Sequence, residues 1–219
     1  MKKLTPDDLN DPARFELLAE IEHRQIKRFI LEQINPSLRI VRIYSAYQVI
    51  MILTLIFLIT KAVISYSRGL SGPVQQITYA VVFSFTALVI IHELLHALAY
   101  RICGARRLKA GAVWKKFVFY VMADKEVIGF KAFRIVAYAP LVVVKLTCLL
   151  LGVLYWYTPY AYFFFSIMCI HSLFCAGDMA MLAFYRAHTG REIYSYDDPA
   201  RGKSFFYARK EEGATNRDE

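Results

Sequence analysis

Four long apolar stretches limit the folds that this sequence can adopt. They cover residues 43–65, 77–100, 135–157 and 160–185, and ionisable side chains are rare within them. Each is long enough to cross a bilayer as a helix, because about 20 apolar residues at 1.5 Å per residue span the hydrocarbon core. With 57% hydrophobic residues, the chain has more apolar surface than a soluble domain needs. The sequence therefore predicts an all-α integral membrane protein, in which residues 37–186 form one domain of about four transmembrane helices.

Basic residues are distributed unevenly among the connections between these predicted helices. Of 27 lysines and arginines, eight precede the first stretch, nine lie within residues 101–134, and seven follow residue 185. The other two connections contain only Arg68. Lysine and arginine enrichment in alternate loops is the positive-inside pattern. We therefore expect a multi-pass protein of the cell membrane with both termini in the cytoplasm. This topology explains the net charge of +9, and no nucleic acid partner is expected.

The segments on either side of the membrane domain are polar and are expected in the cytoplasm. Within residues 1–36, a helix is predicted to start at Thr5, which precedes a proline and two acids. Apolar residues then recur at roughly helical spacing over residues 13–34. We predict an N-terminal amphipathic helix here, which either lies on the membrane surface or packs on the rest of the protein. Residues 187–219 are predicted to form a polar tail that contains turns.

Residues 112–130, between the second and third stretches, differ in composition from their surroundings. They are rich in valine and phenylalanine and have a charged centre at residues 123–126. β-Branched and aromatic residues on both sides of a polar turn predict a short cytoplasmic β-hairpin.

The second apolar stretch contains the motif HELLH at residues 92–96. On a helix, His92 and His96 lie on one face and can bind a single metal ion through their ring nitrogens. Glu93 is placed to take a proton from a water molecule that zinc polarises. Ionisable residues inside a membrane span cost roughly 2.5–3.5 kcal/mol each, so three of them within five positions indicate a function. We interpret the motif as a zinc site with Glu93 as the catalytic residue. The alternative is two structural histidines, with Glu93 paired to Lys145.

A hydrolytic zinc site usually has a third protein ligand, and depth in the membrane favours Asp178. Counted from the basic residues that end the two spans, the motif and Asp178 lie about 10 Å and 12 Å from the same boundary. His171 is about 10.5 Å further along its helix and cannot easily reach the same ion. We expect it to be hydrogen-bonded between helices, and the alternative is a proton relay. Cys175 is a softer alternative ligand. In the other interpretation, Asp178 forms a salt bridge with Lys145.

Lys145 lies near the middle of the third stretch, where an ammonium group needs a partner. We expect Lys145 to lie next to the metal ligands without binding the metal, in one of two roles. Either it stabilises a substrate carbonyl or oxyanion, or it pairs with a carboxylate or extends toward the membrane surface.

Four short motifs follow one another along the chain. They are HELLHA at 92–97, APL at 139–141, AGD at 176–178 and YDD at 196–198. This order resembles the putative zincin peptidases, a family of small bacterial membrane proteins, over about residues 76–208. The resemblance implies a zinc-dependent peptidase.

The arrangement is also similar to site-2 proteases, which have HExxH on one span and an aspartate ligand on a later one. By this likeness His92, His96 and Asp178 are the zinc ligands and Glu93 is the catalytic base. The site-2 family presents its aspartate in the sequence Asn-Pro-Asp-Gly, whereas Asp178 here follows Cys-Ala-Gly and precedes methionine.

Together these features predict a peptidase that hydrolyses a peptide bond near the cytoplasmic side of the membrane, with a peptide or membrane-protein substrate. The hairpin at residues 112–130 is expected to offer its edge to an extended substrate. The alternative is a non-catalytic membrane module whose metal is structural or sensory.

Overall fold

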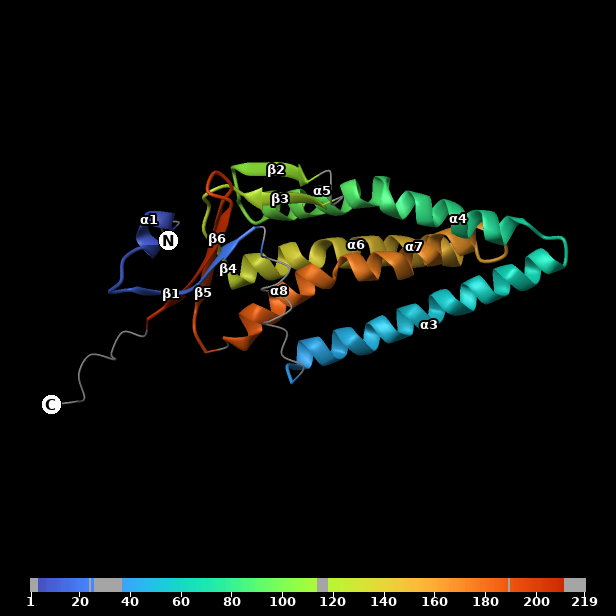
Figure 1. Ribbon diagram of the computed structural model, residues 1–219, viewed down its shortest axis with the longest axis horizontal. Coiled ribbons are helices and arrows are strands. Elements are labelled where there is room, and N and C mark those ends of the chain that lie inside the picture. Colours follow the sequence, from blue (N-terminus) through green and yellow to red (C-terminus); the bar gives the residue numbers. More distant parts are fainter. Residues whose placement is uncertain (1–3, 24, 26–36, 114–117, 189, 211–219) are drawn as a thin grey trace.

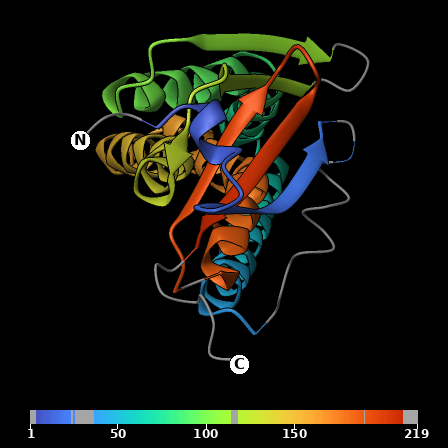
Figure 2. The ribbon, with the colours of Figure 1, turned by 90° about the vertical axis from the view of Figure 1, so that its left-hand side faces the viewer.

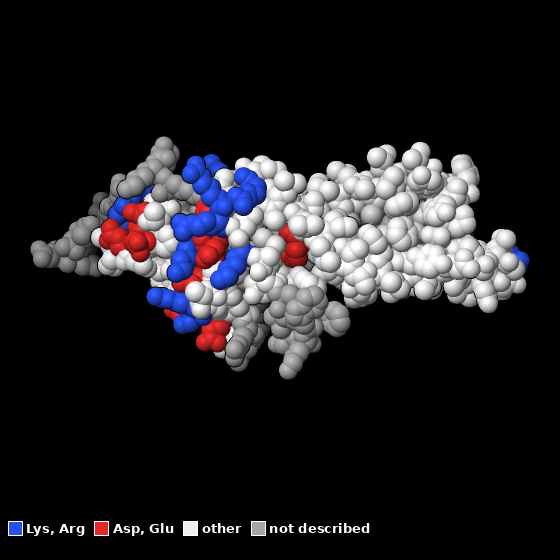
Figure 3. Space-filling view, turned by 90° about the horizontal axis from the view of Figure 1, so that it is seen from above, with Lys and Arg blue, Asp and Glu red and all other residues white. Residues whose placement is uncertain are grey.

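The structure is a computed structural model that describes residues 4–23, 25, 37–113, 118–188 and 190–210. Its helices form an elongated bundle, and its strands gather at one end of that bundle (Figure 1). The first and last described elements, α1 (Pro6–Leu9) and β6 (Lys203–Arg209), both lie at this end. Charged side chains gather over the strand end in Figure 3, whereas uncharged side chains cover most of the helical part. The described chain therefore has a polar end and an apolar end.

The helices agree with the four predicted stretches, but only two of them are long single helices. α3 (Arg39–Ser67) and α6 (Phe130–Leu154) are each long and apolar enough to cross a membrane. The other two stretches are bent pairs: α4 (Gly72–Phe85) with α5 (Ala87–Ile102) at 48°, and α7 (Tyr160–Phe174) with α8 (Ala176–Ala187) at 43°. Among the described residues there are thus two candidate spans, or up to four if each bent pair is one span.

Each bend coincides with a local departure from helical hydrogen bonding. The Thr86 N–H bonds to the Phe83 carbonyl, three residues earlier, at 3.3 Å, whereas in a regular α-helix it would bond four residues back. The Thr86 backbone, at φ −119° and ψ −90°, is itself not helical. At the second bend, the hydrogen bond from the Cys175 N–H to the His171 carbonyl is stretched to 3.4 Å. Consequently the axis of α5 differs in direction from that of α4, and the axis of α8 differs from that of α7.

Small residues allow the helices to approach closely. Gly152 of α6 faces α7, and a Cβ atom at this position would lie 2.7 Å from the Phe165 ring. Three further small residues, Ala80, Cys148 and Cys169, are buried in the hydrophobic cluster against which Phe165 packs. Close approach at small residues is typical of helices that pack within a membrane. By contrast, most of α3 is both apolar and exposed.

Strands from both ends of the chain form a sheet that crosses one end of the bundle (Figure 2). Its four antiparallel strands have the order β1-β6-β5-β4. Besides β6, this sheet contains β1 (Phe15–Glu22), β4 (Ile128–Gly129) and β5 (Ile193–Asp198). The prediction of an all-α protein with one hairpin was therefore too narrow, because the fold is mostly helical with a small antiparallel sheet.

The predicted N-terminal amphipathic helix is wrong for residues 15–22, which form β1. Phe15 and Ile21 are buried, and β1 pairs along its length with β6. Apolar residues three apart fit a helix, but the strand is selected by a partner at the other end of the chain, which the local pattern does not reveal. Residues 26–34 of the predicted helix lie outside the described part.

Two smaller predictions about the polar flanks are confirmed. A helix does start after Thr5, whose side chain and that of Asp8 form a capping box, although α1 ends at Leu9. A turn follows Asp198, where the Arg201 N–H bonds to the Asp198 carbonyl. This turn joins two strands, so part of the predicted tail is structured.

The predicted hairpin is present, but its strands are shifted. β2 (Leu108–Val113) pairs antiparallel with β3 (Val118–Ala123), and residues 114–117 between them lie outside the described part. The predicted turn at residues 123–126 instead leads to β4, which belongs to the other sheet. The polar residues do form a turn, but it joins β3 to β4 and not the two strands of the hairpin.

Candidate metal centre

His92 and His96 lie on one face of α5, and both are buried. Their Nε2 atoms are 3.0 Å apart. Asp178 approaches them from the first turn of α8: its Oδ2 atom is 3.4 Å from His92 Nε2, and its Oδ1 atom is 3.3 Å from His96 Nε2. The structure thus brings together the three residues that the sequence singled out as metal ligands.

The opposite ring nitrogens of both histidines are engaged by other groups. His96 Nδ1 is 3.0 Å from the Val136 carbonyl, which can only accept, so this nitrogen must donate. His92 Nδ1 is 3.0 Å from His171 Nε2. A neutral His96 therefore directs the lone pair of Nε2 toward His92 and Asp178. Hydrogen bonds of this kind fix the tautomer and orientation of metal-binding histidines.

The donors fit a zinc ion. In a tetrahedral site with bonds of about 2.0–2.1 Å, donor atoms are about 3.3 Å apart, close to the three separations observed. The Asp178 Oδ2 atom is buried and has no hydrogen-bond partner among the described residues. Close lone pairs and an unsatisfied carboxylate oxygen are unfavourable together unless a cation lies among them. His92, His96 and Asp178 can hold such an ion.

The bend between α7 and α8 brings Asp178 to this position. Because α8 begins at Ala176, Asp178 lies in its first turn, where a carboxylate is favoured by the helix dipole. Gly177 has no neighbouring atom within 4 Å of where a Cβ would be, so it is not required for close packing here.

Glu93 is half-buried and follows His92 on α5. Its carboxylate interacts electrostatically with His92, His96 and Asp178, and also with the backbone of Val121 in β3. The hairpin therefore reaches the metal centre, a proximity that the sequence did not show. A carboxylate beside a metal site is placed to exchange protons with a water molecule bound there.

His171 lies much closer to the motif than the sequence predicted. The predicted separation of about 10.5 Å assumed one straight helix through both His171 and Asp178, whereas the chain bends at Cys175. His171 is almost fully buried and contacts His92 on the side away from Asp178. Its expected hydrogen bond between helices is present.

A second group of potential donors adjoins the first. The Cys175 Sγ atom is 3.8 Å from His171 Nδ1, and His92, His171 and Cys175 together can also hold a metal ion. From the sequence, Cys175 is expected only as an alternative to Asp178 as third ligand. The i,i+4 spacing of His171 and Cys175, which equals that of His92 and His96, is the signal that could have identified this group.

Lys145 pairs with neither Glu93 nor Asp178, so both alternative ion pairs are wrong in this structure. Its ammonium group donates to the Met168 carbonyl at 3.2 Å and lies 3.0 Å from the Met51 sulfur. It also lies 4.6 Å from the centre of the Tyr47 ring, a cation–π contact. Neutral groups therefore satisfy this ammonium.

Fold and site together describe a mostly helical protein with a His-His-Asp cluster among its apolar helices. Residues 85–189, nearly half of the chain, match the model of a family described as "Putative zincin peptidase". The resemblance to this family is thereby confirmed over the segment that contains α5, the hairpin, α6, α7 and α8, and it implies a zinc peptidase. No curated protein and no solved structure matches the chain.

Proposed function

We propose that this protein is a zinc-dependent, membrane-embedded peptidase that hydrolyses a peptide bond near the cytoplasmic side of the membrane. The observation that carries the proposal is the convergence of His92, His96 and Asp178 donor atoms beside the Glu93 carboxylate. Neither histidine spacing nor family likeness alone would supply the third ligand from another helix.

Each of these residues has a separate task in the proposed reaction. Bound zinc supplies a Lewis acid that polarises a carbonyl group and lowers the pKa of water. Glu93 takes a proton from the attacking water and delivers it to the leaving amine. The Val136 carbonyl holds His96 in the tautomer that leaves Nε2 free for the metal, and His171 does the same for His92 when its own Nε2 accepts.

The proposed position in the membrane follows from charge and hydropathy. If each bent pair is one span, the helices cross four times, and both polar flanks lie on the side of the sheet. Lysine and arginine concentrate on this side, which the positive-inside rule assigns to the cytoplasm. The metal centre lies where α5 and α8 approach the sheet, so cleavage is proposed near the cytoplasmic surface.

The hairpin offers a means of holding the substrate. Because the β3 backbone at Val121 interacts with Glu93, an extended segment bound along β3 would pass the metal centre. We expect that replacing residues 108–123 by a short glycine-serine linker abolishes cleavage while zinc content is retained. Unchanged cleavage by this variant would eliminate the hairpin from the proposal.

A non-catalytic module with a structural or sensory metal is the second candidate. The observation that favours it is the second donor group of His92, His171 and Cys175, since buried sets of cysteine and histidine ligands are typical of structural zinc sites. Zinc content does not distinguish the two candidates, because both require the metal.

Substitution of Glu93 does distinguish them. Glu93→Gln is expected to bind zinc like the wild type and to lower turnover by about 10²–10⁴-fold, the range of general acid–base catalysis. New protein N-termini would be compared by mass spectrometry in membranes of cells that produce wild type, Glu93→Gln, or Glu22→Gln as the matched control on exposed β1. An unchanged set of cleavage products in Glu93→Gln would refute the peptidase and favour the module.

A further inference from the structure

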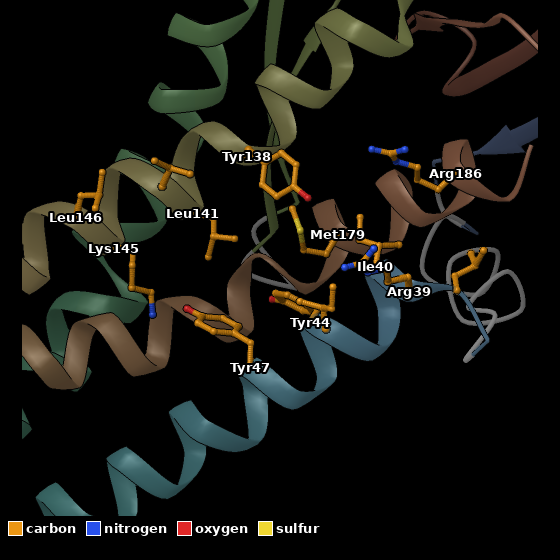
Figure 4. Close-up of a pocket in the computed structure, with 13 residues that line it drawn as sticks. Arg39, Ile40, Tyr44, Tyr47, Tyr138, Leu141, Lys145, Leu146, Met179 and Arg186 are labelled. Atoms are coloured by element: carbon orange, nitrogen blue, oxygen red, sulfur yellow. The ribbon is translucent and has the colours of Figure 1, made fainter. Parts of the chain in front are cut away.

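A cavity of about 720 Å³ lies between α3, α6 and α8 (Figure 4). It is separate from the metal centre, since its lining does not include His92, His96 or Asp178. Met179, the neighbour of Asp178 on α8, is part of the wall. Pockets of about 300–1,000 Å³ are typical of sites that enclose a small ligand.

The charged groups among the described residues of the cavity all have the same sign. Arg39 and Arg186 lie at one end of it in Figure 4, and Lys145 lies toward the other end. None of the described lining residues is a carboxylate. The Arg186 guanidinium lies 5.2 Å from the centre of the Phe130 ring, and the described residues provide no ion pair to either arginine. Two guanidinium groups at one mouth favour an anion that accepts from both.

Apart from three tyrosines, the other described residues of the walls are mostly apolar. Ile40 and Ile43 of α3 line the cavity together with Leu141, Val142 and Leu146 of α6. Between the arginine end and the level of Lys145, α3 advances by about two turns, which is about 12 Å. The cavity thus combines a cationic mouth with an elongated apolar interior, and this is the chemistry of an anionic amphiphile.

The position of the arginines indicates which amphiphile. Arg39 is the first residue of α3, and Arg186 is close to the end of α8, both toward the sheet. In the proposed topology this level is the cytoplasmic membrane surface, where lipid head groups lie. Basic pockets between transmembrane helices on this side bind anionic lipid head groups.

We propose that the cavity binds one anionic glycerophospholipid, with its phosphate between Arg39 and Arg186 and an acyl chain along the apolar wall. The proposal rests on the membrane insertion given under the proposed function, but not on peptidase activity. Lys145 is already held by neutral partners. Its charge raises the potential of the cavity and disfavours any cationic occupant.

A lipid fits this cavity better than a helix of a substrate protein. An α-helix with its side chains is about 10–12 Å in diameter and about 30 Å long when it crosses a membrane, which needs a much larger space than the 720 Å³ of this cavity. A substrate helix in this cavity would also not contact Glu93, because Glu93 lies on α5 and does not line the cavity.

The proposal is tested with the full-length protein in detergent by native mass spectrometry, titrated with phosphatidylglycerol or phosphatidylcholine. We expect wild type to prefer phosphatidylglycerol. The double variant Arg39→Gln/Arg186→Gln should bind it about 30-fold more weakly, since each basic residue near the membrane surface contributes about 1 kcal/mol, or about fivefold in affinity. The matched control Arg42→Gln/Arg134→Gln removes the same charge from exposed positions outside the cavity and should bind like wild type.

A cavity-filling variant, Val142→Trp, retains both arginines and should also lose the lipid, so the proposal remains testable if the double variant does not fold. Zinc content would report on folding in each case. Equal binding of both lipids, or equal weakening in the control, would overturn the proposal. So would a photo-crosslinker at position 142 that captures a polypeptide in membranes rather than a lipid. Loss of lipid binding with cleavage intact would leave the proposed function standing, and the Glu93→Gln experiment tests that function independently.

Discussion

Replacing Asp178 by asparagine removes one of the three proposed zinc donors and leaves the volume of the side chain almost unchanged. The Asp178 Oδ2 atom accepts no hydrogen bond from the described residues, but Oδ1 lies 3.3 Å from His96 Nε2, and the substitution weakens this contact. The main effect should appear in zinc affinity, while the free energy of unfolding of the metal-free protein should fall by about 1–3 kcal/mol.

The magnitude follows from the number of ligands. Zinc held by four protein ligands binds with an apparent free energy of about 10–16 kcal/mol, which is about 3 kcal/mol for each ligand. At 1.4 kcal/mol per tenfold, Asp178→Asn should weaken zinc binding by about 100-fold. His96→Asn should produce a loss of similar size, because its Nε2 lies at a comparable distance from the other donors.

The assay is a competition titration of the purified protein against a chromophoric chelator, with zinc content measured by elemental analysis. Cys175→Ala is the informative control, since Cys175 belongs only to the second donor group. It should bind zinc like wild type. Wild-type affinity in Asp178→Asn would refute the reasoning, and a simultaneous loss in Cys175→Ala would show that His92, His171 and Cys175 hold the metal instead.

Three further predictions concern other parts of the molecule. His171→Phe should weaken zinc binding by about 10–100-fold in the same titration, because it leaves His92 Nδ1 without its partner, and an unchanged affinity would contradict this role. Gly152→Val should lower the free energy of unfolding by about 1–3 kcal/mol through a clash with Phe165, and a second substitution, Phe165→Ala, should restore part of the loss in thermal denaturation. Burial raises the pKa of Asp198, but hydrogen bonds from the Arg201 backbone and the Lys125 ammonium hold it below the usual range. Its contribution to stability is therefore present at neutral pH and lost as the pH falls through that lowered pKa, so melting temperature below about pH 4 should fall less steeply in Asp198→Asn than in wild type.

The helical part of the fold was predictable because its signal is local. A run of about 20 apolar residues specifies a helix whatever its neighbours are, and α3 and α6 follow the predicted stretches closely. The bends at Thr86 and Cys175 were not predictable in the same way, since threonine and cysteine are ordinary within apolar helices. These bends depend on which backbone hydrogen bonds the packed helices retain.

The sheet was mostly missed for the opposite reason. β1 acquires its conformation from β6 at the other end of the chain, and β4 has only two residues. Pairing between distant strands is not visible in a local pattern of apolar residues. The position of His171 was missed because depth along a straight helix does not allow for a bend.

The amino-acid sequence by itself determined which residues can perform the chemistry: His92, Glu93 and His96 through their spacing, and Asp178 as the nearest carboxylate by depth. Only the tertiary structure decided how they meet. The bend at Cys175 directs Asp178 toward α5 and brings His171 behind His92, and packing directs Lys145 away from the metal centre. Spacing along one helix is a property of the chain, whereas an approach between helices depends on where each one bends and on what fills the space between them.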